Sequence, residues 1–154
     1  PDSARAALDA HLCVAFTGRT RLARGLLDSV LRSWQRRDAG MLRVFEALAA
    51  SAHAMAHALQ AGDMARAGAL LSEYWARKKA VAPGAEPAAV TAMLAAIAPY
   101  VHGAALAGAG GGGFLVAISR EAHPTHGALG AALRAHGADV CAVRVVYEHG
   151  VLLA

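Results

Sequence analysis

The pattern of apolar and polar positions predicts a strand near the start of the chain and a helix after it. The segment 12–16, LCVAF, has the two-residue period of a short strand, which Thr17 and Gly18 end. From 21 to 37, leucines and a valine recur at helical spacing opposite charged side chains. We therefore expect a helix over 21–37, in which Trp34 anchors the core.

Three further helices are predicted between residue 41 and Pro99. Apolar residues over 41–59 alternate four- and three-residue steps, a stripe typical of a helix packed along a partner helix. Gly62 is expected to end this helix and Asp63 to cap the next. That helix continues to basic residues at 77–79 and contains Trp75, a second expected core anchor. A fourth helix begins at 86–87 and stops before Pro99.

The C-terminal third alternates between strand and helix patterns. Strands are predicted over 101–107 and 114–119, a helix over 125–136 with Gly137 as its C-terminal cap, and a last strand over 140–147. The order β-αααα-ββ-α-β predicts an α+β fold, a small and mostly antiparallel sheet with several helices packed against it. At 154 residues we expect 1–154 to form a single domain.

Between the two central strands lies a loop with almost no side chains, composed of Gly108, Ala109, Gly110, Gly111, Gly112 and Gly113. Glycine allows positive φ and close backbone approach, and successive N–H groups in such a loop can form a nest for anions. A dinucleotide fingerprint needs a helix after the loop, and a Walker A loop needs Lys and then Ser or Thr. Here the apolar run 114–118 follows, which excludes both motifs.

Composition narrows the classes of partner and compartment. The formal charge of +4 comes from dispersed Lys and Arg and aromatic residues make up 5%, so no nucleic-acid surface is indicated. Pro99 and the glycines interrupt the uncharged stretch 87–119, which argues against a membrane span. Cys13 and Cys141 lie in apolar segments with no secretory signal before them, so we expect reduced, buried cysteines in a cytoplasmic protein.

Candidate side chains for chemistry are few. His53 and His57 have the spacing of a zinc pair, but no third ligand is evident and we predict no metal site. Lys78 and Lys79 fit either a solvated helix end or a cleft, and His102 precedes the glycine loop as either a ligand contact or a structural histidine. No general base is recognisable, so the catalytic residues stay unknown.

Several blocks in the same order resemble the C-terminal domain of GHMP-type small-molecule kinases, and within that family the L-fucose kinases. They are FTGRTRLAR at 16–24, YW at 74–75 with KK at 78–79, APGAEP at 82–87, and APYVHG at 98–103 leading into LAGAGGGGFL at 106–115. The resemblance covers about 12–118 and is weaker from 120 onward. It implies a ferredoxin-like fold and places the glycine-rich loop at the cleft for substrate and nucleotide. Many relatives have Lys and Thr where this chain has Leu106 and Ala107.

The resemblance also implies a reaction. The parent enzyme would transfer the γ-phosphate of ATP, with Mg²⁺, to the anomeric hydroxyl of L-fucose, giving fucose 1-phosphate for GDP-fucose salvage. The family's phosphate-binding motif and catalytic acidic residues belong to an N-terminal domain that nothing here matches. Since the chain begins with Pro1 rather than Met, we expect it to be a fragment. Without the N-terminal domain, we expect it to be inactive alone. ATP and Mg²⁺ would be bound mainly by that absent half. The alternatives are a heptose-phosphate kinase of the same superfamily and a non-catalytic helical interaction domain.

Overall fold

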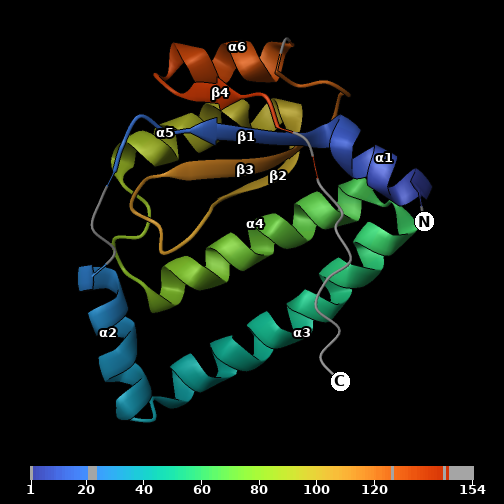
Figure 1. Ribbon diagram of the computed structural model, residues 1–154. Coiled ribbons are helices and arrows are strands. Elements are labelled where there is room, and N and C mark those ends of the chain that lie inside the picture. The colour runs from blue at the N-terminus through green and yellow to red at the C-terminus, as the bar shows by residue number, and fades with distance from the viewer. Residues whose placement is uncertain (1, 21–23, 126, 144, 146–154) are drawn as a thin grey trace.

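A computed structural model describes residues 2–20, 24–125, 127–143 and 145 of the chain (Figure 1). The elements in order are α1 (Asp2–His11), β1 (Leu12–Phe16), α2 (Arg24–Gln35), α3 (Ala39–Ala61), α4 (Met64–Val81), α5 (Ala88–Ile97), a 3₁₀ turn η1 (Ala98–Tyr100), β2 (Val101–Leu106), β3 (Phe114–Ser119), α6 (Ala128–Ala135) and β4 (Asp139–Cys141). This order confirms the predicted one, with an additional N-terminal helix α1 that the sequence analysis did not anticipate.

The strands form one four-stranded sheet in the order β2-β3-β1-β4. Every pair is antiparallel: Val14 lies opposite Val116 in β3 and opposite Cys141 in β4, and Leu106 lies opposite Leu115. The predicted α+β architecture with a small antiparallel sheet is therefore confirmed. Residues 21–23 of the first predicted helix lie outside the described residues.

The last strand is the main error in the predicted elements. β4 ends at Cys141, whereas the alternating pattern predicted a strand over 140–147. Ala142, Val143 and Val145 are described and are not in a strand, and Val143 is 43% exposed. The alternation is local, but a strand also needs a neighbour, and β4 pairs with β1 only over Asp139–Cys141. Residues 144, 146 and 147 lie outside the described part.

The core lies on one face of the sheet. Cys13 and Ala15 of β1 and Leu115 and Ala117 of β3 are fully buried there, in one cluster with the apolar sides of α5 and α6. Both helices lie together on that side of the sheet (Figure 1). The prediction that both cysteines are free is confirmed, but only Cys13 is fully buried and Cys141 is half-buried.

Helix α4 covers the exposed edge of β2. Its Gly68 meets Gly103 so closely that a Cβ on Gly103 would lie 1.8 Å from the Gly68 carbonyl oxygen. One turn further on, Ser72 Oγ accepts a hydrogen bond from the Ala104 N–H at 3.2 Å. The N–H groups along the outer side of an edge strand have no partner strand, so α4 covers this edge as a fifth strand would. Trp75 of the same helix is 3% exposed, which confirms it as a core anchor.

The end of α3 and the start of α4 have the caps that the sequence predicts. Gly62 ends α3 in the left-handed conformation with φ of 71°, and the Asp63 carboxylate accepts the Arg66 N–H at 2.9 Å at the start of α4. Ala58 packs here against Ala67 and Leu70, so the two helices lie close at the turn and diverge toward α2 (Figure 1).

Two large apolar side chains of helix α2 lie at the surface rather than in the core. Trp34 is 52% exposed and its ring packs edge-on against Phe45, with centroids 5.4 Å apart, so the prediction of a core anchor is wrong. Leu31 is likewise exposed. The helical period was right, but Phe45 of α3 covers Trp34 only in part, and Leu31 stays exposed. Among those residues, every helix is too short or too polar to cross a lipid bilayer.

Candidate functional site: the glycine-rich loop

The glycine-rich loop joins β2 to β3 and uses the positive φ angles that its composition allows. Five of its glycines have positive φ: Gly108, Gly110, Gly111, Gly112 and Gly113. Residues 110–112 are buried, whereas Gly108 is exposed. The loop therefore folds back into the protein and leaves only its first residues at the surface.

Two other segments hold this loop by hydrogen bonds. The Gly113 N–H donates to the Arg19 carbonyl at 2.7 Å, and the Gly111 N–H donates to the Ala85 carbonyl at 2.6 Å. In return, the backbone N–H and the hydroxyl of Thr17 both donate to the Gly113 carbonyl at 2.9 Å. These two glycine N–H groups are satisfied by protein carbonyls, so they do not contribute to an anion nest.

Close packing explains why side chains are absent from the loop. A Cβ on Gly110 would lie 2.9 Å from both the Cβ and the carbonyl oxygen of Ala85, and one on Gly112 would lie 2.7 Å from the Arg19 carbonyl oxygen. Real Cβ atoms do not make such contacts without a shift of the neighbouring backbone. The loop is thus clamped between the segment after β1 and the turn after α4, two of the blocks that carry the family resemblance.

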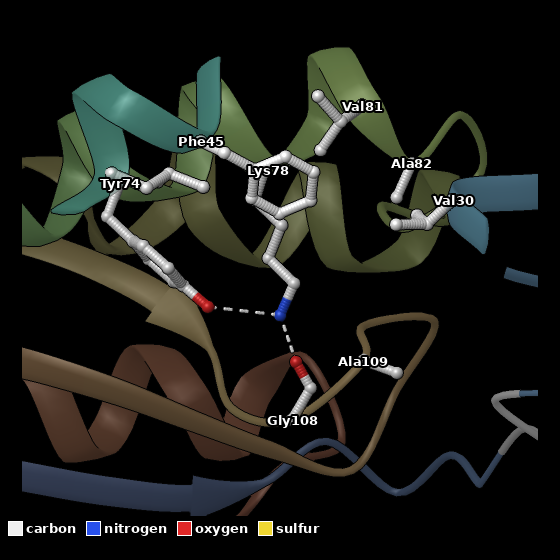
Figure 2. Close-up of a pocket in the computed structure, with 9 residues that line it drawn as sticks. Val30, Phe45, Tyr74, Lys78, Val81, Ala82, Gly108 and Ala109 are labelled. Atoms are coloured by element: carbon white, nitrogen blue, oxygen red, sulfur yellow. Dashed lines mark hydrogen bonds between the residues drawn. The ribbon is translucent and has the colours of Figure 1, made fainter. Parts of the chain in front are cut away.

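A pocket of about 440 Å³ opens beside the exposed start of the loop (Figure 2). It lies between α2, α3, the end of α4 and the loop. Its lining is apolar apart from one ammonium group and one hydroxyl, and comprises Val30, Phe45, Leu48, Tyr74, Lys78, Val81, Ala82, Gly108 and Ala109. An apolar cavity with a few polar groups that converge is the usual form of a small-molecule site.

Lys78 supplies the charge in this pocket. Its Nζ donates to the Gly108 carbonyl and, at 3.2 Å, to the Tyr74 hydroxyl (Figure 2). The ammonium also lies 5.5 Å from the centroid of the Tyr74 ring and 5.7 Å from that of Trp75. Aromatic faces stabilise a cation at this range. Lys78 is therefore half-buried and attached to the loop, which is not the arrangement of a solvated helix end.

Lys79 has a different environment from its neighbour. Its Nζ forms an ion pair with Glu86 Oε2 at 2.8 Å, and it lines a second cavity rather than the apolar pocket. His102 lines that second cavity too, near the start of β2 and beside Arg120. Burial, and then the charges of Arg120 and His11, lower the pKa of His102, while Asp63 opposes them. The structure thus joins Lys78 to the loop and places Lys79 and His102 elsewhere.

The remaining candidates have no site chemistry in the structure. His53 and His57 are both exposed on α3. Within the described residues, no three His, Cys, Asp or Glu side chains converge in a way that could hold a metal ion. Cys13 is buried in the sheet, and burial, with a smaller effect from Cys141 and an opposing one from Arg134, raises the pKa of its thiol to about 11.

Sequence reasoning missed two residues that contact the loop directly, Thr17 and Ala85. Thr17 is 3% exposed and Ala85 is fully buried. Both stand within the blocks 16–24 and 82–87 that carry the resemblance, but their contacts cross from those blocks to the loop. Periodicity carries no signal for such contacts, because it reports only on neighbours along the chain.

The fold, the clamped glycine loop and its adjoining pocket define an α+β domain with a candidate small-molecule site. A family model described as GHMP kinases C terminal matches residues 55–139. The chain belongs to this family.

Two curated proteins are similar to most of this chain. The chain is 34% identical over 113 residues to L-fucokinase/L-fucose-1-P guanylyltransferase of Bacteroides fragilis, covering 73% of this chain and 12% of that protein. It is 30% identical over 115 residues to the bifunctional fucokinase/GDP-fucose pyrophosphorylase of Arabidopsis thaliana, covering 75% of this chain and 11% of the relative. The chain thus spans about an eighth or less of the length of these proteins.

Solved structures agree on the fold. Mevalonate kinase of L. major, crystallised with R-mevalonate, superposes with a TM-score of 0.71 at 22% identity, over 82% of this chain and 38% of that one. Phosphomevalonate kinase of Streptococcus pneumoniae superposes with a TM-score of 0.67 at 14% identity, over 85% and 38%. These likenesses establish a shared architecture with GHMP-family kinases.

Proposed function

We propose that this chain is the C-terminal part of a sugar kinase that transfers the γ-phosphate of ATP to the anomeric hydroxyl of L-fucose. The reaction forms a bond between the anomeric oxygen and the γ-phosphorus, breaks the bond to ADP, and releases the hydroxyl proton. The substrate is inferred from the names of the two curated relatives. The chain alone is expected to be inactive, because an N-terminal part would supply the phosphate loop and the base.

The observation that carries this proposal is the way the glycine loop is built. Arg19 and Ala85 fix its backbone from two sides, and Lys78 holds its exposed start at the mouth of an apolar pocket. Positioning and electrostatics supply most of the catalysis of phosphoryl transfer, so a rigid loop with an adjoining cation suits one wall of such a cleft. We propose that Lys78 faces the substrate side of this cleft.

Neither ATP nor Mg²⁺ is assigned a ligand set on this chain. No acidic cluster that fits a metal is present in the described residues. The Gly111 and Gly113 N–H groups, which could have cradled a phosphate, are satisfied by carbonyls within the protein. We propose that the N-terminal part of the kinase holds the metal and the phosphates.

A sugar-kinase assay tests the proposal. The chain is assayed alone and joined to the sequence that precedes it in its gene, with ATP and a panel of L-fucose, other sugars and a heptose phosphate. Fucose 1-phosphate from the joined protein, and none from the chain alone, is the expected result. Phosphorylation of a heptose phosphate in preference to L-fucose would instead assign the chain to that kinase class.

One observation supports a second candidate, a non-catalytic interaction domain. Leu31 and Trp34 of α2 are 55% and 52% exposed, which is unusual for large apolar side chains on one helix. If the joined protein folds and phosphorylates nothing on the panel, this reading becomes the better one.

A further inference from the structure

We propose that Glu86 is a positioning residue of the glycine loop: it fixes the turn at 82–87, whose Ala85 carbonyl holds the Gly111 N–H. The inference rests on the proposed function only for the role of the loop in a kinase cleft. The mechanical link from Glu86 to Gly111 stands on the contacts below.

Three donors from two helices converge on the Glu86 carboxylate. Trp75 Nε1 of α4 donates to Oε2, and Lys79 of the same helix forms an ion pair with that oxygen at 2.8 Å. Thr91 Oγ1 of α5 donates to Oε1 at 2.9 Å. The Glu86 side chain is only 12% exposed. Hydrogen bonds to ionised groups are stronger than neutral ones. The carboxylate therefore ties the turn to both helices.

The turn carries this restraint to the loop. The Ala85 carbonyl and the Glu86 N–H belong to one planar peptide group, so a fixed Glu86 limits how that carbonyl can rotate. Ala85 is fully buried, and its N–H donates to the Ala82 carbonyl at 3.0 Å. Its carbonyl accepts the Gly111 N–H at 2.6 Å while its side chain fills the space beside Gly110. Rotation of the peptide group would break the bond to Gly111.

The charge state of Glu86 suits this role. Burial alone would raise the pKa of Glu86, but the hydrogen bonds from Lys79, Trp75 and Thr91 and the charge of Lys79 hold the pKa below its ordinary value. Lys79 is the charged group that faces the carboxylate, whereas Trp75 of α4 and Thr91 of α5 are uncharged. Glu86 is therefore ionised at neutral pH, and acid weakens the restraint.

Backbone amide NMR of this chain tests the link directly. In Glu86→Gln, the Gly111 amide is expected to shift and to exchange with solvent at least about tenfold faster, the loss that corresponds to about 1.4 kcal/mol. The Gly113 amide, which donates to Arg19 instead, is the control within the same loop and should keep its exchange rate. Glu73→Gln is the matched variant, because Glu73 pairs with Arg66 and Arg77 on α4 and lies outside the turn.

A pH titration separates positioning from general stability. In the wild type, the Gly111 resonance should move as Glu86 becomes protonated in acid, and this movement should be absent in Glu86→Gln while Gly113 behaves alike in both. Thr91→Val removes one of the three donors to Glu86. It should shift Gly111 in the same direction by less, and it serves if Glu86→Gln does not fold. Gly111 exchange that stays at the wild-type rate in the folded variants would overturn the inference.

Activity of the joined kinase is read separately. If that protein makes fucose 1-phosphate, Glu86→Gln should alter KM and kcat to different extents, and Glu73→Gln should alter neither. If Gly111 responds to Glu86 and the joined protein phosphorylates no sugar, the link is supported and the proposed function fails.

Discussion

Gly110 and Gly113 have similar φ angles in different surroundings. Their φ angles are 93° and 85°, but a Cβ on Gly110 would lie 2.9 Å from Ala85 atoms, and one on Gly113 would meet nothing within 4 Å. Gly113→Ala should lower the free energy of unfolding by the left-handed penalty, about 1–2 kcal/mol. Gly110→Ala should lose a further ~1–3 kcal/mol through overpacking.

Urea denaturation of both variants measures this difference, with an unchanged slope against urea as the check that the same unfolding transition is compared. Equal losses in the two variants would mean that Ala85 moves away at little cost. The tight fit between the loop and the turn would then be wrong.

The buried thiol of Cys13 makes stability depend on alkaline pH. Its pKa is raised from 9.0 to about 11, by burial first and then by Cys141. The folded state therefore retains a proton that the unfolded state loses, so this contribution is complete below pH 9 and is lost as pH rises to 11. The whole effect is at most ~2.7 kcal/mol, from two pKa units.

Unfolding curves at pH 8 to 11 measure this effect. Cys13→Ala should lose less stability over that range than the wild type, whatever its stability at neutral pH. Cys141→Ala, at a half-buried position, should retain most of the alkaline slope. A slope that is the same in Cys13→Ala and the wild type would show that another group titrates.

Helix α4 and strand β2 approach each other closely at Gly68 and Gly103. A Cβ on Gly103 would lie 1.8 Å from the Gly68 carbonyl oxygen and 2.6 Å from Ser72 Oγ. Gly103→Ala must push α4 off the strand edge and break the Ser72 bond to Ala104, so we expect a loss of about 3 kcal/mol or more.

Gly127→Ala is the matched control for this substitution. The nearest atom to its added Cβ would be Glu121 Oε2 at 3.8 Å, an ordinary contact. It should therefore change the free energy of unfolding by less than about 1 kcal/mol. Circular dichroism during chemical denaturation gives both values. Equal stability of the two variants would contradict the close approach of α4 to β2.

The sequence predicted the helices and strands better than it predicted the contacts between them. The bounds 12–16 and 114–119 are those of β1 and β3, because alternation over a short run is a local signal. Gly62 and Asp63 were identifiable because a left-handed end and a side-chain cap depend on the residue itself. By contrast, the predicted burial of Trp34 and the predicted length of β4 were wrong. The burial of a side chain and the pairing of a strand both depend on elements distant in sequence.

The same limit applies to the site. Composition showed that the glycine loop could take positive φ, and the structure has it at five glycines. It could not predict that Arg19 and Ala85 would occupy two of the loop N–H groups, or that Lys78 would bond to Gly108 while Lys79 turned to Glu86. Adjacent lysines on a helix point about 100° apart, so their partners depend on which segments the fold brings to each side.

Across the whole molecule, stability is expected to be uneven. The large core joins the sheet to α4, α5 and α6, whereas Val30 is the α2 side chain within the described set that packs against it. Elements with few buried apolar contacts open at lower free energy than the global transition.

We therefore expect amides in the middle of α2 to exchange with solvent at least about a hundredfold faster than those in the middle of α4, a difference of ~2.7 kcal/mol in the free energy of opening. Hydrogen exchange by mass spectrometry resolves the two helices, and α5 serves as the control because Val90, Met93 and Ile97 are all buried. Slow exchange in α2, equal to that of α5, would mean that its exposed stripe is covered in solution, by a second copy of the chain if dilution then restores rapid exchange.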